Sequence, residues 1–334
     1  MAACIAELPD GKLDVVGDVH GHWHALRDLI ARLGYDDHGR HPQQRRLVFV
    51  GDLCDRGPDS PAVVDWVLQR IREGRAWAVM GNHELNLLRQ ERKEGNDWFW
   101  DEHTAHDHKF EPFKRLERAQ RQAMLDGLAA LPLVLARDDL RVVHAGWSDV
   151  AVGALQGRSF DGPVGFRALF EEFEDAVRHE AALLQADKAR EMASWKPHLH
   201  DRTMAVPMLR ATAQCDVLHQ SGNPVRVLTS GLEQLTQAPH FSSGKWRFTD
   251  RQKWWEMYPG PVPVVVGHYW RRPPGSQASA PHKEGKPPDL MAEYRALDWL
   301  GPGGKVFCVD YSVAAGGKLA ALRWPEREVQ FAEV

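Results

Sequence analysis

A short stretch between residues 51 and 57 carries two carboxylates and a guanidinium. Asp52, Asp55 and Arg56 stand there in a glycine-flanked segment, Gly-Asp-x-x-Asp-Arg-Gly, directly after the apolar run 47–50. Such a run is typical of a buried strand, and the flanking glycines favour a tight loop at its end. We therefore expect the three side chains to emerge together, an arrangement suited to a metal ion and a phosphate group. Taken alone, an acidic turn of this kind is equally typical of a helix cap.

The same layout recurs further along the chain. Apolar runs at 13–16, 76–80, 140–143 and 264–266 each lead into oxygen or imidazole donors. These donors are Asp18, His20, Asn82, His83, His144 and His268. Helix capping does not explain the whole set. In sheets with parallel strands, ligands bind beyond the carboxyl ends of the strands, so we expect the donors to converge there.

The donor types indicate which metals the site suits. Carboxylate, imidazole and amide oxygen, without thiolate, fit manganese, iron or zinc better than a structural zinc held by cysteines. Two ions roughly 3.5–4 Å apart need a shared carboxylate, and Asp52, on the central predicted strand, is the natural bridge. The remaining ligands divide into Asp18 and His20 for one ion, and Asn82, His144 and His268 for the other.

The neighbouring residues suggest how phosphate chemistry would proceed. Two such ions activate a water for in-line attack on phosphorus. Arg56 can fork onto phosphate oxygens. His83 is placed to face the leaving-group oxygen, and Asp55 can fix its tautomer and raise its basicity.

Alternating strands and helices are expected to position these residues. Apolar spacing of three and four predicts a helix over 23–33, and Ser60-Pro61 opens a second helix that runs to Arg72. This order predicts parallel neighbouring strands with helices on the faces of the sheet. Further expected elements are a hairpin formed by 133–136 and 140–143, a helix over 112–128, a strand over 225–228 and a second hairpin formed by 305–310 and 319–324.

The chain of 334 residues reads as a single domain, residues 1–334, without repeats or a clear linker. Residues 150–260 combine an amphipathic helical stretch with a segment rich in Pro, Gly and Trp. We expect them to form a helical and loop insertion that covers the site. Within it, Trp254 and Trp255 are predicted to pack in the core, with stacking on a nucleobase as the alternative.

Charge and cysteine usage exclude several classes of protein. The net charge of −4 gives no nucleic-acid-binding field, and no apolar run is long enough to cross a membrane. The four cysteines include no C-x-x-C pair, which indicates reduced thiols rather than a disulfide framework. No signal peptide is visible at residues 1–10. A cytoplasmic protein without membrane or nucleic-acid partners is predicted, and its oligomeric state is left open.

Together, these motifs resemble those of the calcineurin-like metallophosphoesterases, and within them the phosphoprotein phosphatase branch. That branch includes bacterial Ser/Thr phosphatases and symmetrical diadenosine tetraphosphatases. The segment 309–322 is similar to the way its bacterial members end. The resemblance implies an α/β fold, more closely a two-sheet α+β sandwich flanked by helices in four layers. It also implies two divalent metal ions, with manganese expected and iron, zinc, nickel or cobalt as alternatives.

The sequence departs from the branch at one residue, the arginine that serves beside Arg56 as a second phosphate-binding side chain, here called the second phosphate clamp. Protein phosphatases of this branch carry Arg before the Gly-Asn-His motif, whereas Met80 stands here. Arg271 and Arg272, which follow Gly267-His268, are the candidate substitutes that bind substrate, and Arg226 is a third.

These features predict an enzyme, a dinuclear metal-dependent phosphoesterase that hydrolyses phosphate monoesters or phosphoanhydrides through metal-activated hydroxide. Its phosphorylated substrate would be a small molecule, a nucleotide or a phosphoprotein, the last making it a Ser/Thr phosphatase. The first alternative is a hydrolase of dinucleoside polyphosphates such as diadenosine tetraphosphate. The second is a metal-bearing binding scaffold that has lost catalysis.

Overall fold

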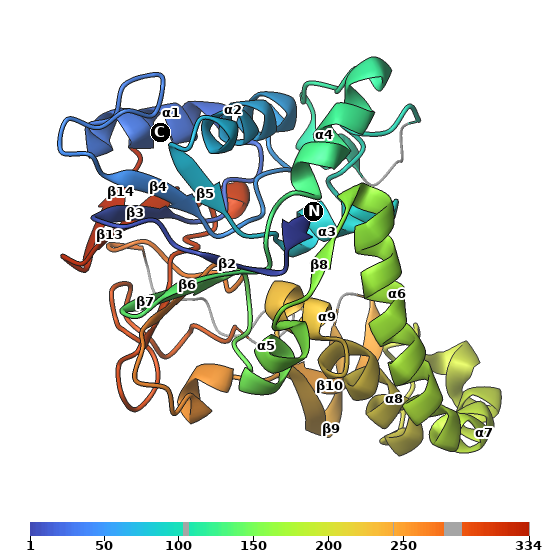
Figure 1. Ribbon diagram of the computed structural model, residues 1–334. Helices are drawn as coiled ribbons and strands as arrows, with labels where there is room; N and C mark the ends of the chain where they lie inside the picture. The colour runs from blue at the N-terminus through green and yellow to red at the C-terminus, as the bar shows by residue number, and fades with distance from the viewer. Residues whose placement is uncertain (103–106, 243, 277–288, 334) are drawn as a thin grey trace.

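Two five-stranded sheets lie at the centre of the computed structural model, which describes residues 1–102, 107–242, 244–276 and 289–333. In Figure 1 they lie one above the other. The first sheet has the order β14 (Glu328–Phe331), β13 (Ala320–Trp324), β3 (Leu13–Val16), β4 (Arg46–Phe49) and β5 (Ala76–Ala78). The second has the order β12 (Val306–Cys308), β11 (Val264–Val266), β7 (Leu140–Val143), β6 (Val134–Arg137) and β2 (Ile5–Glu7). This is the mixed α/β architecture that the sequence predicts.

Parallel strands bring the predicted donor loops to common edges. In the first sheet β3, β4 and β5 run parallel, and in the second β7, β11 and β12 do so. Because the carboxyl ends of parallel neighbours meet at one edge, the loops after these strands lie side by side. β6 and β7 form the predicted hairpin.

Apolar side chains from both sheets pack against one another between them. Val15 and Val48 come from the first sheet, and Val142, Val265 and Phe307 come from the second. All five are buried. Burial of a side chain of this size contributes about 1.5–3 kcal/mol. The strands that carry the donor loops are thus held in a common core.

Helices cover the outer face of the first sheet, where Figure 1 shows α1 (Trp23–Leu33) and α2 (Ser60–Arg72) lying across it. α1 matches its predicted range. α2 begins as predicted with Pro61 in its first turn, and the Asp59 side chain caps it by accepting from the Ala62 N–H at 3.2 Å. Two further helices are α3 (Asn82–Leu88) and α4 (Arg121–Leu128).

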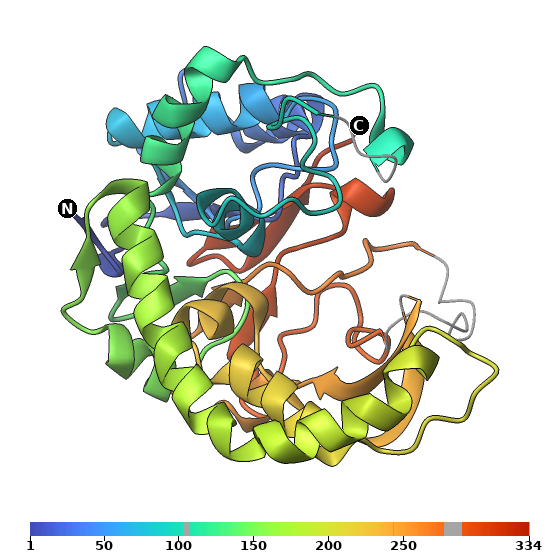
Figure 2. The ribbon, with the colours of Figure 1, turned by 90° about the vertical axis from the view of Figure 1, so that its right-hand side faces the viewer.

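The region 150–260 gathers on the side of the molecule away from α1 and α2 (Figures 1 and 2). It includes a long two-stranded ribbon, β9 (Glu233–Ser242) paired with β10 (Lys245–Arg251). Its helices are α5 (Asp149–Leu155), α6 (Gly162–Ala181), α7 (Gln185–Trp195), α8 (Arg210–Ser221) and α9 (Pro224–Ser230). The β8 strand (Ser159–Phe160) pairs with β1 (Ala2–Ala3). The predicted role of this region as a cover for the site stays a prediction.

Short 3₁₀ helices connect several of these elements. They are η1 (Asp107–Phe110), η2 (Arg118–Gln120), η3 (Ala182–Leu184), η4 (Lys196–His198), η5 (Trp254–Met257) and η6 (Val313–Ala315).

Three predicted elements differ from the structure. Residues 225–228 are helical within α9, because Pro224 occupies the first turn and the Asn223 side chain caps it by accepting from the Val225 N–H at 3.0 Å. The helix expected over 112–128 begins only at η2 and α4. The strands at 306–308 and 320–324 form no hairpin, since β12 pairs with β11 in one sheet while β13 pairs with β3 and β14 in the other.

The structure bears on two further predictions, one about membrane-spanning segments and one about the cysteines. None of their helices combines the length and apolar character that a bilayer span requires. Cys4, Cys54, Cys215 and Cys308 are all buried free cysteines.

Candidate metal centre

Glycines at the strand ends allow the donor loops to approach closely. Gly51 has a φ of +96°, and a Cβ there would lie 2.5 Å from the Gly81 nitrogen. A Cβ on Gly267 would lie 2.0 Å from Asp18 Oδ1. A larger residue at either position would push two donor loops apart.

Asp52 lies at the centre of the predicted donors. Its Oδ2 is 3.4 Å from His144 Nε2, 3.7 Å from His20 Nε2 and 3.8 Å from His83 Nε2. All four residues are buried. The structure thus brings together imidazoles from three separate strand ends around one carboxylate.

Asn82 joins His268 to this group. Its Oδ1 lies 2.9 Å from His268 Nδ1 and 3.2 Å from His144 Nε2. Asp18 lies beside His268, whose backbone N–H donates to Asp18 Oδ2 at 3.0 Å. The six predicted metal ligands therefore occupy one continuous cluster.

Two sets of donor atoms are close enough to hold an ion, with ligand atoms within 4.8 Å of one another in each set. One consists of His20, Asp52 and His83, and the other of Asp52, His144 and His268. Both contain Asp52, which agrees with a bridging position. The first contains His83, a residue predicted to contact the leaving group, rather than Asp18.

Hydrogen bonds on the far side of two imidazoles, those of His144 and His20, fix which nitrogen faces the cluster. His144 Nδ1 lies 2.7 Å from the Val50 carbonyl, and His20 Nδ1 lies 3.0 Å from the Cys54 carbonyl. A carbonyl only accepts, so Nδ1 donates in both cases and Nε2 of the neutral ring is an acceptor. In His144 this acceptor faces the oxygens of Asp52 and Asn82. Converging acceptors of this kind need a cation between them, so the donor set fits a metal.

In the chain without metal, protons and cationic side chains offset this crowding. Burial opposes ionisation of Asp52, but His144 and His83 hold its pKa well below the ordinary value. Burial likewise opposes protonation of His144, but Asp52 raises its pKa to about 10. Arg56 Nη1 donates to His20 Nε2 at 3.1 Å. Burial, and then the charge of Arg56, lowers the pKa of His20.

Strained backbone is concentrated at the cluster. A left-handed φ costs a residue other than glycine roughly 1–2 kcal/mol, and such strain is typical of functional sites. The predicted site residues with positive φ are His20, Asp52, Asp55, Arg56 and His268.

A chain of hydrogen bonds orients His83. Its Nδ1 donates to Asp55 Oδ2 at 2.5 Å, and Trp98 Nε1 donates to the other oxygen of Asp55 at 2.6 Å. All three side chains are buried. Asp55 therefore lies where the sequence predicts, whereas no sequence motif pointed to Trp98.

Glu84 connects two donor loops, because its carboxylate accepts from the backbone N–H groups of Gly81 and Asp52 at 2.9 Å each.

The arginines predicted to bind substrate differ in position. Arg56 lies at the cluster. Arg271 is buried, and its guanidinium donates to the carbonyls of Cys308 at 3.2 Å and Arg295 at 2.9 Å, and to that of Asp298. Arg272 pairs with Asp289 at 2.8 Å. These contacts give Arg271 a structural role and do not support contact of either residue with substrate.

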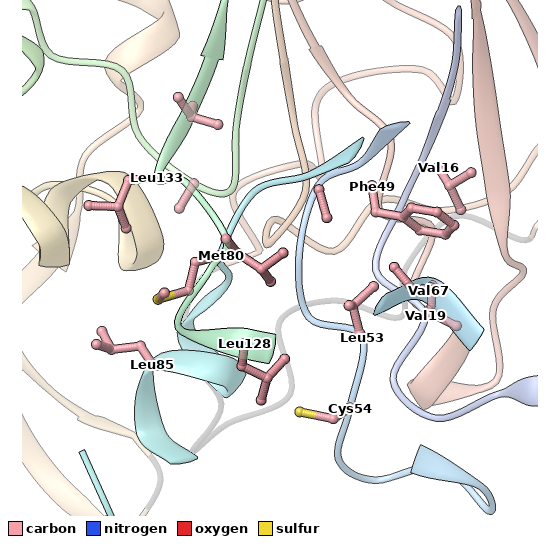
Figure 3. Close-up of a cluster of buried hydrophobic side chains, with 14 of the residues drawn as sticks. Val16, Val19, Phe49, Leu53, Cys54, Val67, Met80, Leu85, Leu128 and Leu133 are labelled. Atoms are coloured by element: carbon pink, nitrogen blue, oxygen red, sulfur yellow. The ribbon is translucent and has the colours of Figure 1, made fainter. Parts of the chain in front are cut away.

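Other candidates from the sequence lie in the interior or are paired. Met80 is fully buried and points into the cluster of apolar side chains drawn in Figure 3, beside Leu85 and Leu133. Arg226 pairs with Glu174 at 2.8 Å. Trp254 and Trp255 are buried, which confirms the packing role over the stacking alternative.

Three residues near the cluster were not among the predicted ones. Trp270 is 52 % exposed, and the Arg56 guanidinium lies 5.7 Å from its ring centre. The second is Arg251, whose charge, after burial, lowers the pKa of His268. Its side chain has no hydrogen-bond or ion-pair partner within the described part of the chain. The third is Asp310, a buried carboxylate after β12.

Comparison with known proteins identifies the family. The family model described as calcineurin-like phosphoesterase matches residues 11–200, more than half of the chain. The chain belongs to the calcineurin-like phosphoesterases. The family uses divalent metal ions, in agreement with the candidate ligands around Asp52.

Two bacterial relatives of this calcineurin-like phosphoesterase are named asymmetrical bis(5'-nucleosyl)-tetraphosphatase PrpE. The Oceanobacillus iheyensis protein is 43% identical over 81 residues, and the Anoxybacillus flavithermus protein is 45% identical over 79 residues. Each match covers 23% of this chain and 32% of the relative. The chain thus spans about a third of the length of these curated relatives.

Solved structures with a similar course of the chain include two phosphatases. A protein serine/threonine phosphatase from Saccharomyces cerevisiae has a TM-score of 0.48 at 15% identity, over 100% of this chain and 84% of its own. A cold-active protein-tyrosine phosphatase of a Shewanella species has a TM-score of 0.45 at 18% identity, over 98% of this chain and 83% of its own. The substrate of this chain follows from neither.

Proposed function

We propose that this chain is a metal-dependent phosphoesterase that hydrolyses phosphate monoesters or phosphoanhydrides. The main support is the convergence of acceptor atoms on Asp52, with His144 and His20 turning Nε2 toward its Oδ2 at 3.4 and 3.7 Å. Such a set of buried acceptors suits cations. Family membership supports the same activity.

The metal would be held by the carboxylates, imidazoles and amide oxygen of the cluster, a set that favours manganese, with iron, zinc, nickel or cobalt as alternatives. When bound, a pair of such ions polarises a phosphoryl oxygen and lowers the pKa of water. The proposed ligands are Asp18, His20, Asp52, Asn82, His144 and His268.

The side chains around the metal would position and protonate the substrate. Arg56 lies beside His20 and can turn its guanidinium from that imidazole onto phosphate oxygens. His83 donates from Nδ1 to Asp55, so the proton that it exchanges is the one on Nε2. We assign this Nε2 to protonation of the leaving-group oxygen. Trp98 keeps Asp55 in place for that task.

These contacts also argue against an inactive scaffold. A protein that only bound metal would have no need of a buried imidazole held by a carboxylate at 2.5 Å, or of the tryptophan that holds the carboxylate. Such oriented pairs are typical of acid–base catalysis.

A dinucleoside polyphosphate is the second candidate substrate, favoured by one observation at the rim of the cluster. Trp270 exposes 52 % of its surface next to Arg56, so a nucleobase could stack on the indole while the guanidinium holds phosphate. The printed names of the bacterial relatives agree with this chemistry.

An activity screen with added manganese tests the proposal. We expect the wild type to hydrolyse at least one of four compounds: p-nitrophenyl phosphate, bis(p-nitrophenyl) phosphate, a phosphopeptide and diadenosine tetraphosphate. We expect D52N to abolish this activity without changing the circular dichroism spectrum. D187N, which alters an exposed aspartate, serves as the matched control. The proposal fails if the wild type is inactive on all four compounds, or if D52N retains activity.

The W270A variant separates the two kinds of substrate. If a nucleotide is the substrate, W270A should raise KM for diadenosine tetraphosphate by about 5- to 150-fold, because stacking on an aromatic ring contributes about 1–3 kcal/mol per base. Turnover of inorganic tripolyphosphate, which lacks a base, should not change. Equal effects on both compounds would favour a substrate without a nucleobase.

A further inference from the structure

Asp310 occupies the same position on its strand as the proposed ligand His268. β11 and β12 are parallel, and Val266 pairs with Cys308 at their carboxyl ends. Two residues beyond this pair stand His268 and Asp310. Beyond this pair, the Asp310 carbonyl accepts from the backbone N–H of Arg271 at 2.9 Å, so the Asp310 backbone lies beside the segment that follows His268.

The first sheet approaches Asp310 from the other side. A Cβ on Gly17 would lie 2.3 Å from the Val309 carbonyl oxygen, so the end of β3 touches the end of β12. Asp18 follows Gly17, and Asp310 follows Val309. Two carboxylates from different sheets thus emerge at one point.

One oxygen of Asp310 is buried without a partner. The side chain is 1 % exposed, and Oδ1 accepts from the Ser312 N–H at 2.7 Å. Oδ2 has no hydrogen-bond partner among the residues that the structure describes. A buried carboxylate oxygen left unpaired is costly unless a cation lies near it.

The nearby arginine does not supply that cation. Arg271 donates its backbone N–H to the Asp310 carbonyl at 2.9 Å, but its guanidinium turns to other carbonyl groups. No side chain in the described part of the chain donates a hydrogen bond to Oδ2.

We propose that Asp310 is a further carboxylate of the metal centre, with Oδ2 neutralised by the divalent cation held at Asp18 and His20. The inference rests on the proposed metal centre and adds a member to it. It assigns a purpose to a buried charge that the six predicted ligands leave unexplained.

Manganese binding to D310N, measured by isothermal titration calorimetry, tests this role. We expect the affinity to fall by about 10- to 100-fold, as is usual when a carboxylate around a metal is lost. We also expect metal-free D310N to melt at a higher temperature than the metal-free wild type, because an unpaired buried charge is removed. A purely structural carboxylate would produce the opposite shift.

E174Q is the matched control. Glu174 is also buried, but it is paired with Arg226 and with Asn223 at 2.8 Å. We expect E174Q to lower the melting temperature of the metal-free protein and to leave manganese affinity unchanged.

The outcomes separate this inference from the proposed function. If wild type binds manganese, D52N does not and D310N binds like wild type, Asp310 is no part of the centre and the metal site stands. If the wild type binds no manganese, the centre itself is refuted. Should D310N not fold, a crystal of the wild type soaked in manganese decides. An ion coordinated by Oδ2, or bound to it through one water, supports the inference, and an ion beyond that reach overturns it.

Discussion

His83 can serve either as a proton donor or as a metal ligand, because its Nε2 lies 3.8 Å from Asp52 Oδ2 and its Nδ1 is held by Asp55. We expect the first role. H83Q should then lower kcat by about 10²–10⁴-fold, the usual contribution of a positioned acid or base. Its manganese content, measured by mass spectrometry of the desalted protein, should match that of wild type. Loss of one ion per chain would make His83 a ligand instead.

Arg251 is the residue that we expect to take the place of the second phosphate clamp. It lies close enough to His268 to lower the pKa of that imidazole, and its guanidinium is unpaired within the described residues. A hydrogen bond between charged groups contributes about 1.5–3 kcal/mol, so R251A should raise KM by roughly 10- to 100-fold. Steady-state kinetics on a phosphorylated substrate measures this effect.

R272A provides the comparison for that experiment. Arg272 is a neighbour of the cluster in sequence, but it is committed to Asp289 at 2.8 Å. We expect its KM to equal that of wild type. An unchanged KM in R251A, or a raised one in R272A, would reverse the assignment.

At the scale of the elements, the donor loops were predictable because each combines an apolar run, a glycine and a polar side chain. Asp52 and His144 are found through that pattern. Asp310 follows the apolar run 306–309 in the same way, but no glycine stands within five residues of it on either side, so the pattern passes over it. Its importance depends on the register between β11 and β12, which no local sequence signal specifies.

Pairing between distant segments explains the other differences. β12 and β13 are adjacent in sequence, yet β13 finds its partner in β3, near the other end of the chain. Val225 and Val227 favour a strand by residue type, but Asn223 and Pro224 provide a helix start. Arg251 is the last residue of β10, in the ribbon formed with β9. No sequence motif indicates where this ribbon lies in the fold.

The first sheet contains an ion pair whose loss should destabilise the fold without touching the cluster. Asp14 on β3 accepts from Arg45 Nη2 at 2.7 Å, from Tyr35 Oη at 2.8 Å and from Arg323 Nε of β13 at 3.1 Å. Asp14 and Arg45 are fully buried. We expect D14A to lower the free energy of unfolding by about 3–5 kcal/mol, because it leaves the buried Arg45 guanidinium with only Glu326 as its ionic partner.

Urea denaturation measures that loss. D187A removes an ion pair between exposed side chains on α7 and should change stability by no more than about 0.5 kcal/mol. If D14A proves as harmless as D187A, the pair contributes little to holding β3 against β13.

At the scale of the whole molecule, the cluster joins the two sheets. Asp18 and Asp52 follow strands of the first sheet, and His144 and His268 follow strands of the second. A cation bound among them should stabilise the folded chain, by about 2.7 kcal/mol at a concentration 100 times its Kd. For a protein of this size we expect a rise in melting temperature of about 4 °C. Differential scanning calorimetry with manganese, and then with excess chelator, checks both the rise and its reversal. An unchanged melting temperature would mean that no cation links the sheets.

The location of the metal in a crystal tests the central claim most directly. Anomalous scattering from crystals soaked in manganese should reveal two peaks roughly 3.5–4 Å apart, on either side of the Asp52 carboxylate. One peak should lie toward Asp18 and His20, and the other toward Asn82, His144 and His268. The absence of peaks at Asp52, or a single peak remote from it, would contradict the account.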